Sequence, residues 1–291
     1  MSHGNSILIN ALKRSVKMEN FFSGFIATGT EKVRCGFGNG DCIMIDLEKR
    51  IFAAADASER NPWASRDLLV RYQNNLSAES GMLGIDDLKN NIKQIYSEQD
   101  FRHKTTFSSV WIEKENGTVS LRVASGGDSM VIVLDKETGS VEYKTSVDMK
   151  FAGRSLLEAS MTKVELKDKK YRVILATDGY SDLVKQIGAV SDNRLHEILF
   201  LTEVHDVAEG LLAELELHKG KIEYDDIGFI IFDPYYNIKK SSIKLMIGGT
   251  NSREEKLYEN QGKLELKDEW RDEIFWKENP DGLKLAGIIL N

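Results

Sequence analysis

The sequence predicts an α+β domain in which helices cover two sheets built mostly from antiparallel strands. Three strand–turn–strand patterns occur along the chain, and apolar segments with helical spacing fill the gaps between strands. Strands come first, then two helices, a run of strands, two more helices and a last strand. This order disfavours a doubly wound parallel sheet, in which strands and helices alternate. With 291 residues, 41% of them hydrophobic, the chain can bury a large core.

Each strand–turn–strand pattern is an apolar or alternating run interrupted by polar turn residues, which predicts an antiparallel hairpin. The second carries the strongest signal, because its turn contains Asn116-Gly117, a pair that tight hairpin turns favour. The paired runs are residues 42–45 with 51–55, 109–113 with 119–124, and 130–134 with 141–143. Hairpins in succession build sheets of antiparallel strands.

Two further strands are predicted at residues 171–176 and 227–232, because their continuous apolar character suits a sheet that is covered on both faces. Helices are predicted where apolar residues recur at helical spacing. They are residues 62–76, residues 88–96, and two segments between 192 and 218 with a break near Thr202.

The predicted domain spans residues 1–233, and Asp233-Pro234 closes its last strand. Residues 234–291 differ in character, because they are charged and carry isolated aromatic residues. We therefore expect residues 234–291 to form a C-terminal appendage.

Composition limits the partners and the compartment. The net charge of −7 disfavours nucleic acid, whose phosphates are bound by clustered Lys and Arg. Cys35 and Cys42, the two cysteines of the sequence, do not form the framework of a disulfide-stapled secreted protein. The apolar patch at residues 7–9 is too short for a signal peptide or a membrane span. We expect a cytoplasmic protein without a nucleic-acid or membrane partner.

Aspartates recur at the ends of the predicted strands, where the edges of two sheets can bring them together. They are Asp41, Asp56, Asp128, Asp178 and Asp225. Any one such residue is more often a turn former or helix cap. Carboxylates that converge repel one another unless they take up protons or bind a cation, and Mg²⁺ or Mn²⁺ suits ligands that are all oxygen. A pair of such ions can activate a water and neutralise phosphate oxygens, so the pattern predicts phosphomonoester hydrolysis.

The aspartates lie in segments that resemble motifs of the metal-dependent (PPM, or type 2C) protein phosphatases. Residues 53–57 (Ala-Ala-Ala-Asp-Ala) resemble the strand-ending Asp-Gly motif, and residues 125–129 (Ser-Gly-Gly-Asp-Ser) the Gly-Asp-Ser motif. Residues 176–182 (Ala-Thr-Asp-Gly-Tyr-Ser-Asp) resemble the specific Ser-Asp-Gly-x-x-Asp motif, and Asp225-Asp226 precedes a final apolar strand as in the family. The likeness spans residues 34–232 and implies a four-layer αββα sandwich with two central sheets.

The resemblance implies a role for each acid of a dinuclear centre. Asp56 would bridge two catalytic Mg²⁺ or Mn²⁺ ions, and Asp178 and Asp225 would hold one of them. The Ala57 carbonyl would complete the shell of the other ion. Asp41 corresponds to the early acid that orients metal-bound water.

The resemblance also implies a third, weaker metal site and a phosphate clamp. Asp128 and Asp182, together with Asp178, match the positions that bind the third ion. Arg34 resembles the arginine that holds phosphate oxygens as a bidentate donor. Arg34 is separated from Asp41 by a few more residues than is usual in the family, and Lys32 or Arg60 are alternatives for this role.

The sequence departs from the family directly after Asp56, the acid that ends its strand. Residues 56–60 are Asp-Ala-Ser-Glu-Arg where the family has Asp-Gly-x-Gly-Gly, so the turn glycines are absent. A histidine proposed as general acid in some relatives is also absent. Because several positions change together, we expect a remodelled loop in which Ala57 has a negative φ.

The resemblance implies a metal-dependent protein serine/threonine phosphatase, which hydrolyses phosphomonoesters with a water activated by a dinuclear Mg or Mn centre. Its substrate would be a phosphoserine or phosphothreonine protein, a target of a cytoplasmic kinase. One alternative is a pseudophosphatase that keeps the fold as a binding or regulatory module. Another is a phosphatase of small phosphorylated metabolites. Retention of the acids favours the enzyme, and loss of the glycine turn favours the pseudophosphatase.

Overall fold

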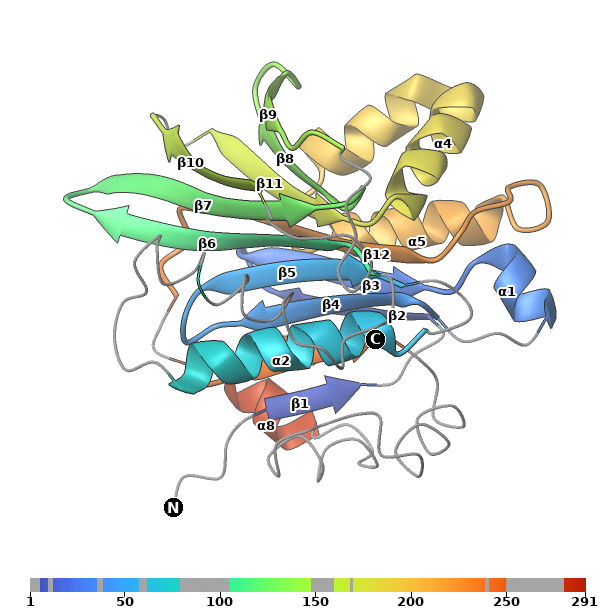
Figure 1. The fold of residues 1–291 in the computed structure, drawn as a ribbon. Helices are drawn as coiled ribbons and strands as arrows, with labels where there is room; N and C mark the ends of the chain where they lie inside the picture. The colour runs from blue at the N-terminus through green and yellow to red at the C-terminus, as the bar shows by residue number, and fades with distance from the viewer. Residues whose placement is uncertain are drawn as a thin grey trace, which may run out of the picture.

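The computed structural model describes residues 6–9, 13–35, 39–57, 62–78, 90, 105–147, 160–167, 170–238, 241–249 and 280–291. Two seven-stranded sheets form the centre of this described part, and helices cover their outer faces (Figure 1). The predicted four-layer sandwich of two mostly antiparallel sheets is therefore confirmed.

The first sheet has the order β1-β13-β4-β5-β6-β7-β10. Its strands are β1 (Ser6–Ile9), β13 (Lys244–Gly248), β4 (Asp41–Asp46), β5 (Ile51–Asp56), β6 (Phe107–Glu115), β7 (Thr118–Gly126) and β10 (Ser160–Leu166). The pairing of β1 with β13 is parallel, and the other pairings of this sheet are antiparallel. β4 and β5, which carry two of the predicted acids, lie near its middle.

The second sheet has the order β14-β2-β3-β12-β11-β8-β9 and antiparallel pairings throughout. Its strands are β14 (Ile288–Leu290), β2 (Lys13–Met18), β3 (Phe22–Ala27), β12 (Ile227–Phe232), β11 (Tyr171–Ala176), β8 (Met130–Asp135) and β9 (Val141–Lys144). The two strands predicted from continuous apolar runs, β11 and β12, are central neighbours and are entirely buried.

The three predicted hairpins are confirmed as β4–β5, β6–β7 and β8–β9. The β6–β7 turn has a positive φ at both central residues, 50° at Asn116 and 82° at Gly117. That geometry matches the right-handed twist of the flanking strands, which explains why Asn-Gly was a reliable signal.

Apolar side chains fill the space between the sheets and beneath the helices. Between the sheets, the ring of Phe52 from β5 stacks on that of Phe232 from β12, with centroids 4.2 Å apart. Other buried clusters lie under α2 (Ala64–Ala78) and under α4 (Gly179–His196) and α5 (Val207–Leu217). Figure 1 shows α2 lying along β4 and β5, with α4 and α5 on the far side of the sandwich.

The predicted helices agree with the structure in part. α2 matches the prediction after Pro62, and the break near Thr202 is confirmed: the π-helical turn η1 (Glu197–Leu201) ends there and α5 follows. α4 begins at Gly179, well before the predicted start. The helix predicted over residues 88–96 lies outside the described residues, apart from Asn90.

The described parts of the predicted appendage, residues 234–291, include strands of both sheets. β13 pairs with β4, and β14 follows the short helix α8 (Pro280–Leu285) and pairs with β2. No helix in the described ranges is long and apolar enough to cross a membrane.

Candidate metal centre

Asp41 and Asp56 lie next to each other at the same end of two neighbouring strands. Asp41 is the first residue of β4 and Asp56 the last residue of β5, and the antiparallel register pairs the two positions directly. The second sheet brings Asp128 and Asp178 to one end of its own strands. Asp128 precedes β8 and Asp178 follows β11, which are antiparallel neighbours. The strand-end pattern therefore converges as predicted for these four acids.

Asp56, Asp128 and Asp178 form the tightest group. Each offers a carboxylate oxygen, and these oxygens lie within 4.8 Å of one another. Asp178 is the residue immediately before α4. Asp128 Oδ1 is buried and has no hydrogen-bond partner among the described residues. These oxygens are thus available as ligands, and their all-oxygen set fits Mg²⁺ or Mn²⁺.

The pKa values of these acids show what their proximity costs. Burial and the charge of Asp178 raise the pKa of Asp56 to about 7. Burial and the charge of Asp128 raise the pKa of Asp178 to about 6. For Asp41, burial and the charge of Asp56 raise the pKa well above its usual range. Without cations, these acids therefore keep their protons to a higher pH than ordinary aspartates do, whereas bound divalent ions would stabilise their charged forms.

Thr177 fixes the orientation of Asp41. Its hydroxyl donates to Asp41 Oδ2 at 2.5 Å and accepts from the Gly228 N–H at 2.8 Å. The Asp41 backbone is held as well, because its N–H donates to Asn39 Oδ1 at 2.8 Å and its carbonyl accepts from the Gly249 N–H at 2.6 Å. Asp41 Oδ1 remains buried with no donor against it among the described residues. That oxygen is suited to accept a hydrogen bond from a ligand or a water.

The chain passes Ala57 without strain. Ala57 is not among the described residues with positive φ, so the expectation of a negative φ is confirmed. Its N–H donates to the Gly40 carbonyl at 3.0 Å, and a Cβ on Gly40 would come within 2.0 Å of the Ala57 carbonyl oxygen. Close approach of the two backbones therefore requires glycine at position 40.

Asp182 and Asp225 lie beside this group and are more exposed. Asp182, in the first turn of α4, pairs with Lys185 Nζ at 3.1 Å. The Asp225 side chain is 55% exposed and pairs with Lys32 Nζ at 2.8 Å. Both acids line a pocket of about 350 Å³. Its other lining residues are Thr30, Glu31, Lys32, Glu223 and Tyr224.

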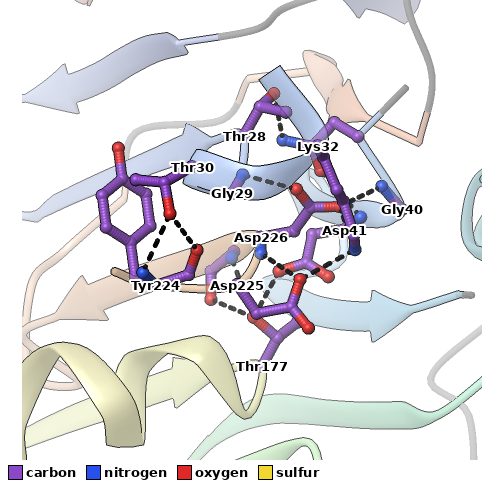
Figure 2. Close-up of polar contacts among 12 residues, drawn as sticks. Thr28, Gly29, Thr30, Lys32, Gly40, Asp41, Thr177, Tyr224, Asp225 and Asp226 are labelled. Atoms are coloured by element: carbon purple, nitrogen blue, oxygen red, sulfur yellow. Dashed lines mark hydrogen bonds and ion pairs between the residues drawn. The ribbon is translucent and has the colours of Figure 1, made fainter. Parts of the chain in front are cut away.

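Lys32 bridges two acids at the edge of the cluster (Figure 2). Besides Asp225, its Nζ contacts Asp226 Oδ2 at 2.9 Å. Asp226 is 1% exposed and also accepts from the N–H groups of Gly29 at 2.7 Å and Gly40 at 2.6 Å. Although burial lowers the pKa of Lys32, the two carboxylates raise it above its ordinary value, so Lys32 stays charged.

The phosphate-clamp candidates have different outcomes. Lys32 and Arg34 lie on α1 (Thr30–Cys35), and the side chain of Arg34 is not described. Arg60 lies outside the described residues. The described contacts of Lys32 are with carboxylates.

Sequence analysis assigned no role to Asp226, Thr177 or Gly40. For Thr177 and Asp226 the available signal was their position in the sequence. Each is the immediate neighbour of a predicted ligand, Asp178 or Asp225, and its polar side chain can reach another strand.

A scan against protein-family models finds no match, and no curated protein matches the sequence. Solved structures do match. The catalytic domain of the serine/threonine protein phosphatase PstP, in complex with two manganese ions, superposes with a TM-score of 0.55 at 18% identity over 76% of this chain and 98% of that chain. A bacterial serine phosphatase gives a TM-score of 0.58 at 20% identity over 74% and 97%. Stp1 from Staphylococcus aureus gives 0.55 at 16% over 73% and 94%. The chain shares the fold of these proteins, with a sequence that has diverged far from theirs.

Proposed function

From the fold of the metal-dependent serine/threonine phosphatases, we propose that this chain is itself a metal-dependent protein phosphatase acting on phosphoserine or phosphothreonine. The observation that carries the proposal is the group formed by Asp56, Asp128 and Asp178, whose oxygens lie within 4.8 Å of one another at the sheet edge. A chain that gained nothing from cations would have little reason to keep such mutually repelling acids together. The proposed cofactor is Mg²⁺ or Mn²⁺.

Specific residues would divide the work. Asp56, Asp128 and Asp178 would hold the cations, with Asp225, Asp182 and the Ala57 carbonyl as further ligands at their side. When bound, divalent cations lower the pKa of a water and neutralise phosphate oxygens. Asp41, clamped by Thr177, would orient the attacking water through its unsatisfied Oδ1. Arg34 would contact the substrate phosphate.

The proposed substrate is a cytoplasmic phosphoprotein, the target of a protein kinase. The acidic group formed by Asp56, Asp128 and Asp178 can accept a phosphoprotein only when cations are present. The bound ions reverse the local sign of the charge and allow a phosphate dianion to enter. Small phosphorylated metabolites would meet the same ions, so a phosphopeptide and a small ester should be compared side by side.

The test is phosphate release from a phosphoserine peptide and from p-nitrophenyl phosphate, measured with Mn²⁺, with Mg²⁺ and with chelator. We expect turnover with either cation, none with chelator, and loss of turnover in Asp178→Asn, which removes one ligand charge and keeps the side-chain volume. A folded wild-type protein that binds Mn²⁺ and releases no phosphate from either substrate would contradict the proposal.

The alternative function is a pseudophosphatase that uses this fold to bind a partner. One observation favours it: the carboxylate of Asp225 is already neutralised by Lys32, so this ligand is engaged without a metal. Binding of phosphopeptide without turnover, unaffected by chelator, would support the alternative.

A further inference from the structure

Lys32 lies on a helix whose start is tied to both sequence neighbours of Asp225 (Figure 2). The Thr30 N–H donates to the Tyr224 carbonyl at 3.0 Å. The N–H of Gly29, one residue earlier, donates to Asp226 Oδ1 at 2.7 Å. The backbone that carries the lysine is therefore fixed relative to the segment that carries the acid, and the meeting of the two side chains is built into the fold.

The two carboxylate partners of Lys32 differ in how firmly they are held. Asp226 is buried, accepts from two backbone N–H groups and forms an ion pair at 2.9 Å. Asp225 is largely exposed, and its described contacts, with Lys32 at 2.8 Å and with the Asp226 N–H at 2.7 Å, fall on one oxygen, Oδ1. Asp226 is the permanent anchor of the ammonium group, and Asp225 is the partner that can be given up at lower cost.

A divalent ion on Asp225 would meet the ammonium of Lys32 on the same carboxylate. Whichever oxygen the ion used, two positive charges would then share one acid within a few ångströms, and their repulsion would weaken binding of the ion. The lysine is held in place by Asp226, so it cannot move away freely.

We propose that Lys32 is a tethered internal cation that competes with a divalent metal ion for Asp225, and so sets the metal affinity of that side of the centre. This inference rests on the proposed function only in assuming that the centre binds divalent ions. Lys32 would stay on Asp226 when the ion arrives and release Asp225.

The test is calorimetric titration of Mn²⁺ into the metal-free full chain, with neutral replacements of the lysine. We expect Lys32→Met to tighten the Asp225-dependent binding event by about tenfold or more, because it removes one nearby positive charge. Lys32→Gln should give the same gain and, since its amide can still donate to Asp226, it serves if the methionine variant fails to fold. Lys32→Arg, which keeps the charge, should stay close to wild type.

The gain must depend on Asp225. In an Asp225→Asn background the same lysine substitutions should give no gain. Lys219→Met is the matched control for loss of a lysine, because Lys219 pairs with Glu216 at 3.0 Å on the exposed surface; it should leave the isotherm unchanged.

Three outcomes would overturn the inference. Unchanged or weaker Mn²⁺ binding in both folded neutral variants would show that Lys32 does not compete, while the proposed phosphatase function would stand. A gain that persists with Asn at position 225 would show that the lysine acts elsewhere. Failure of every variant, wild type included, to bind Mn²⁺ would overturn both the inference and the proposed function.

Discussion

Replacement of Thr177 by valine should uncouple the orientation of Asp41 from the rest of the fold. The hydroxyl is buried, donates to Asp41 Oδ2 at 2.5 Å and accepts from the Gly228 N–H at 2.8 Å. Valine keeps the shape of the side chain and removes both contacts. Because burial and the charge of Asp56 raise the pKa of Asp41, both hydrogen bonds are counted at the neutral value of about 1 kcal/mol each, so we expect the free energy of unfolding to fall by roughly 2 kcal/mol.

The same substitution should lower turnover of the phosphopeptide, because Asp41 Oδ1 would no longer be held toward the centre. Urea denaturation measures the stability, and initial rates with saturating Mn²⁺ measure the turnover. Thr177→Ser, which keeps the hydroxyl, should restore most of the turnover, and Thr162→Val on the exposed edge strand β10 should change stability by no more than about 0.5 kcal/mol. Wild-type stability and turnover in Thr177→Val would refute the reasoning.

Three other predictions follow from the centre. The folded pKa of Asp56 is raised to about 7, so the stability that its proton supplies is present at low pH and lost as the pH rises from about 4 to about 7. The chelator-treated protein should therefore melt at a lower temperature at pH 8 than at pH 5, and Mn²⁺ should reverse this difference. A melting temperature in chelator that stays constant or rises between pH 5 and pH 8 would contradict the prediction. Gly40→Ala places a Cβ within 2.0 Å of the Ala57 carbonyl oxygen, so it should destabilise the fold by about 1–3 kcal/mol and weaken Mn²⁺ binding. Denaturation measures the first effect and calorimetry the second. An unchanged stability and an unchanged Mn²⁺ affinity would mean that the two backbones separate freely. Asp128→Ala should weaken Mn²⁺ binding more than Asp182→Ala, because Asp128 belongs to the close group and Asp182 is exposed and paired with a lysine; the reverse order in calorimetry would place the ions differently.

The parts of the fold that could be predicted from sequence have local determinants. The Asn116-Gly117 turn, the apolar runs of β11 and β12, and the spacing of α2 are each encoded within a short window. β3 was missed although it is wholly buried in the second sheet. Its Gly24 is unusual for a strand, and the reason lies elsewhere in the chain: a Cβ there would come within 2.8 Å of the Phe229 carbonyl oxygen.

β13 could not be predicted for the same reason. It is a short apolar segment that pairs with β1 and β4, and β4 lies some 200 residues earlier in the chain. Local patterns do not record which distant strand offers a free edge.

The candidate site shows the same division. Strand ends predicted the positions of Asp41, Asp56, Asp128 and Asp178, because antiparallel neighbours end at a common edge. The bridge from Lys32 to Asp226 joins residues 194 positions apart, and nothing near either residue indicates it. Sequence reasoning therefore found the ligand candidates and missed the residues that hold them in place.

Titration of Mn²⁺ into the wild-type protein and into Asp56→Asn is the most direct test of the claim that this acidic group is a metal centre. Asp56 lies at the meeting point of the two sheets, paired in register with Asp41 and grouped with Asp128 and Asp178. The account predicts binding to the wild type and its loss in the variant, which should fold at least as well without metal because one repelling charge is gone. Identical binding isotherms for the two proteins would contradict the account.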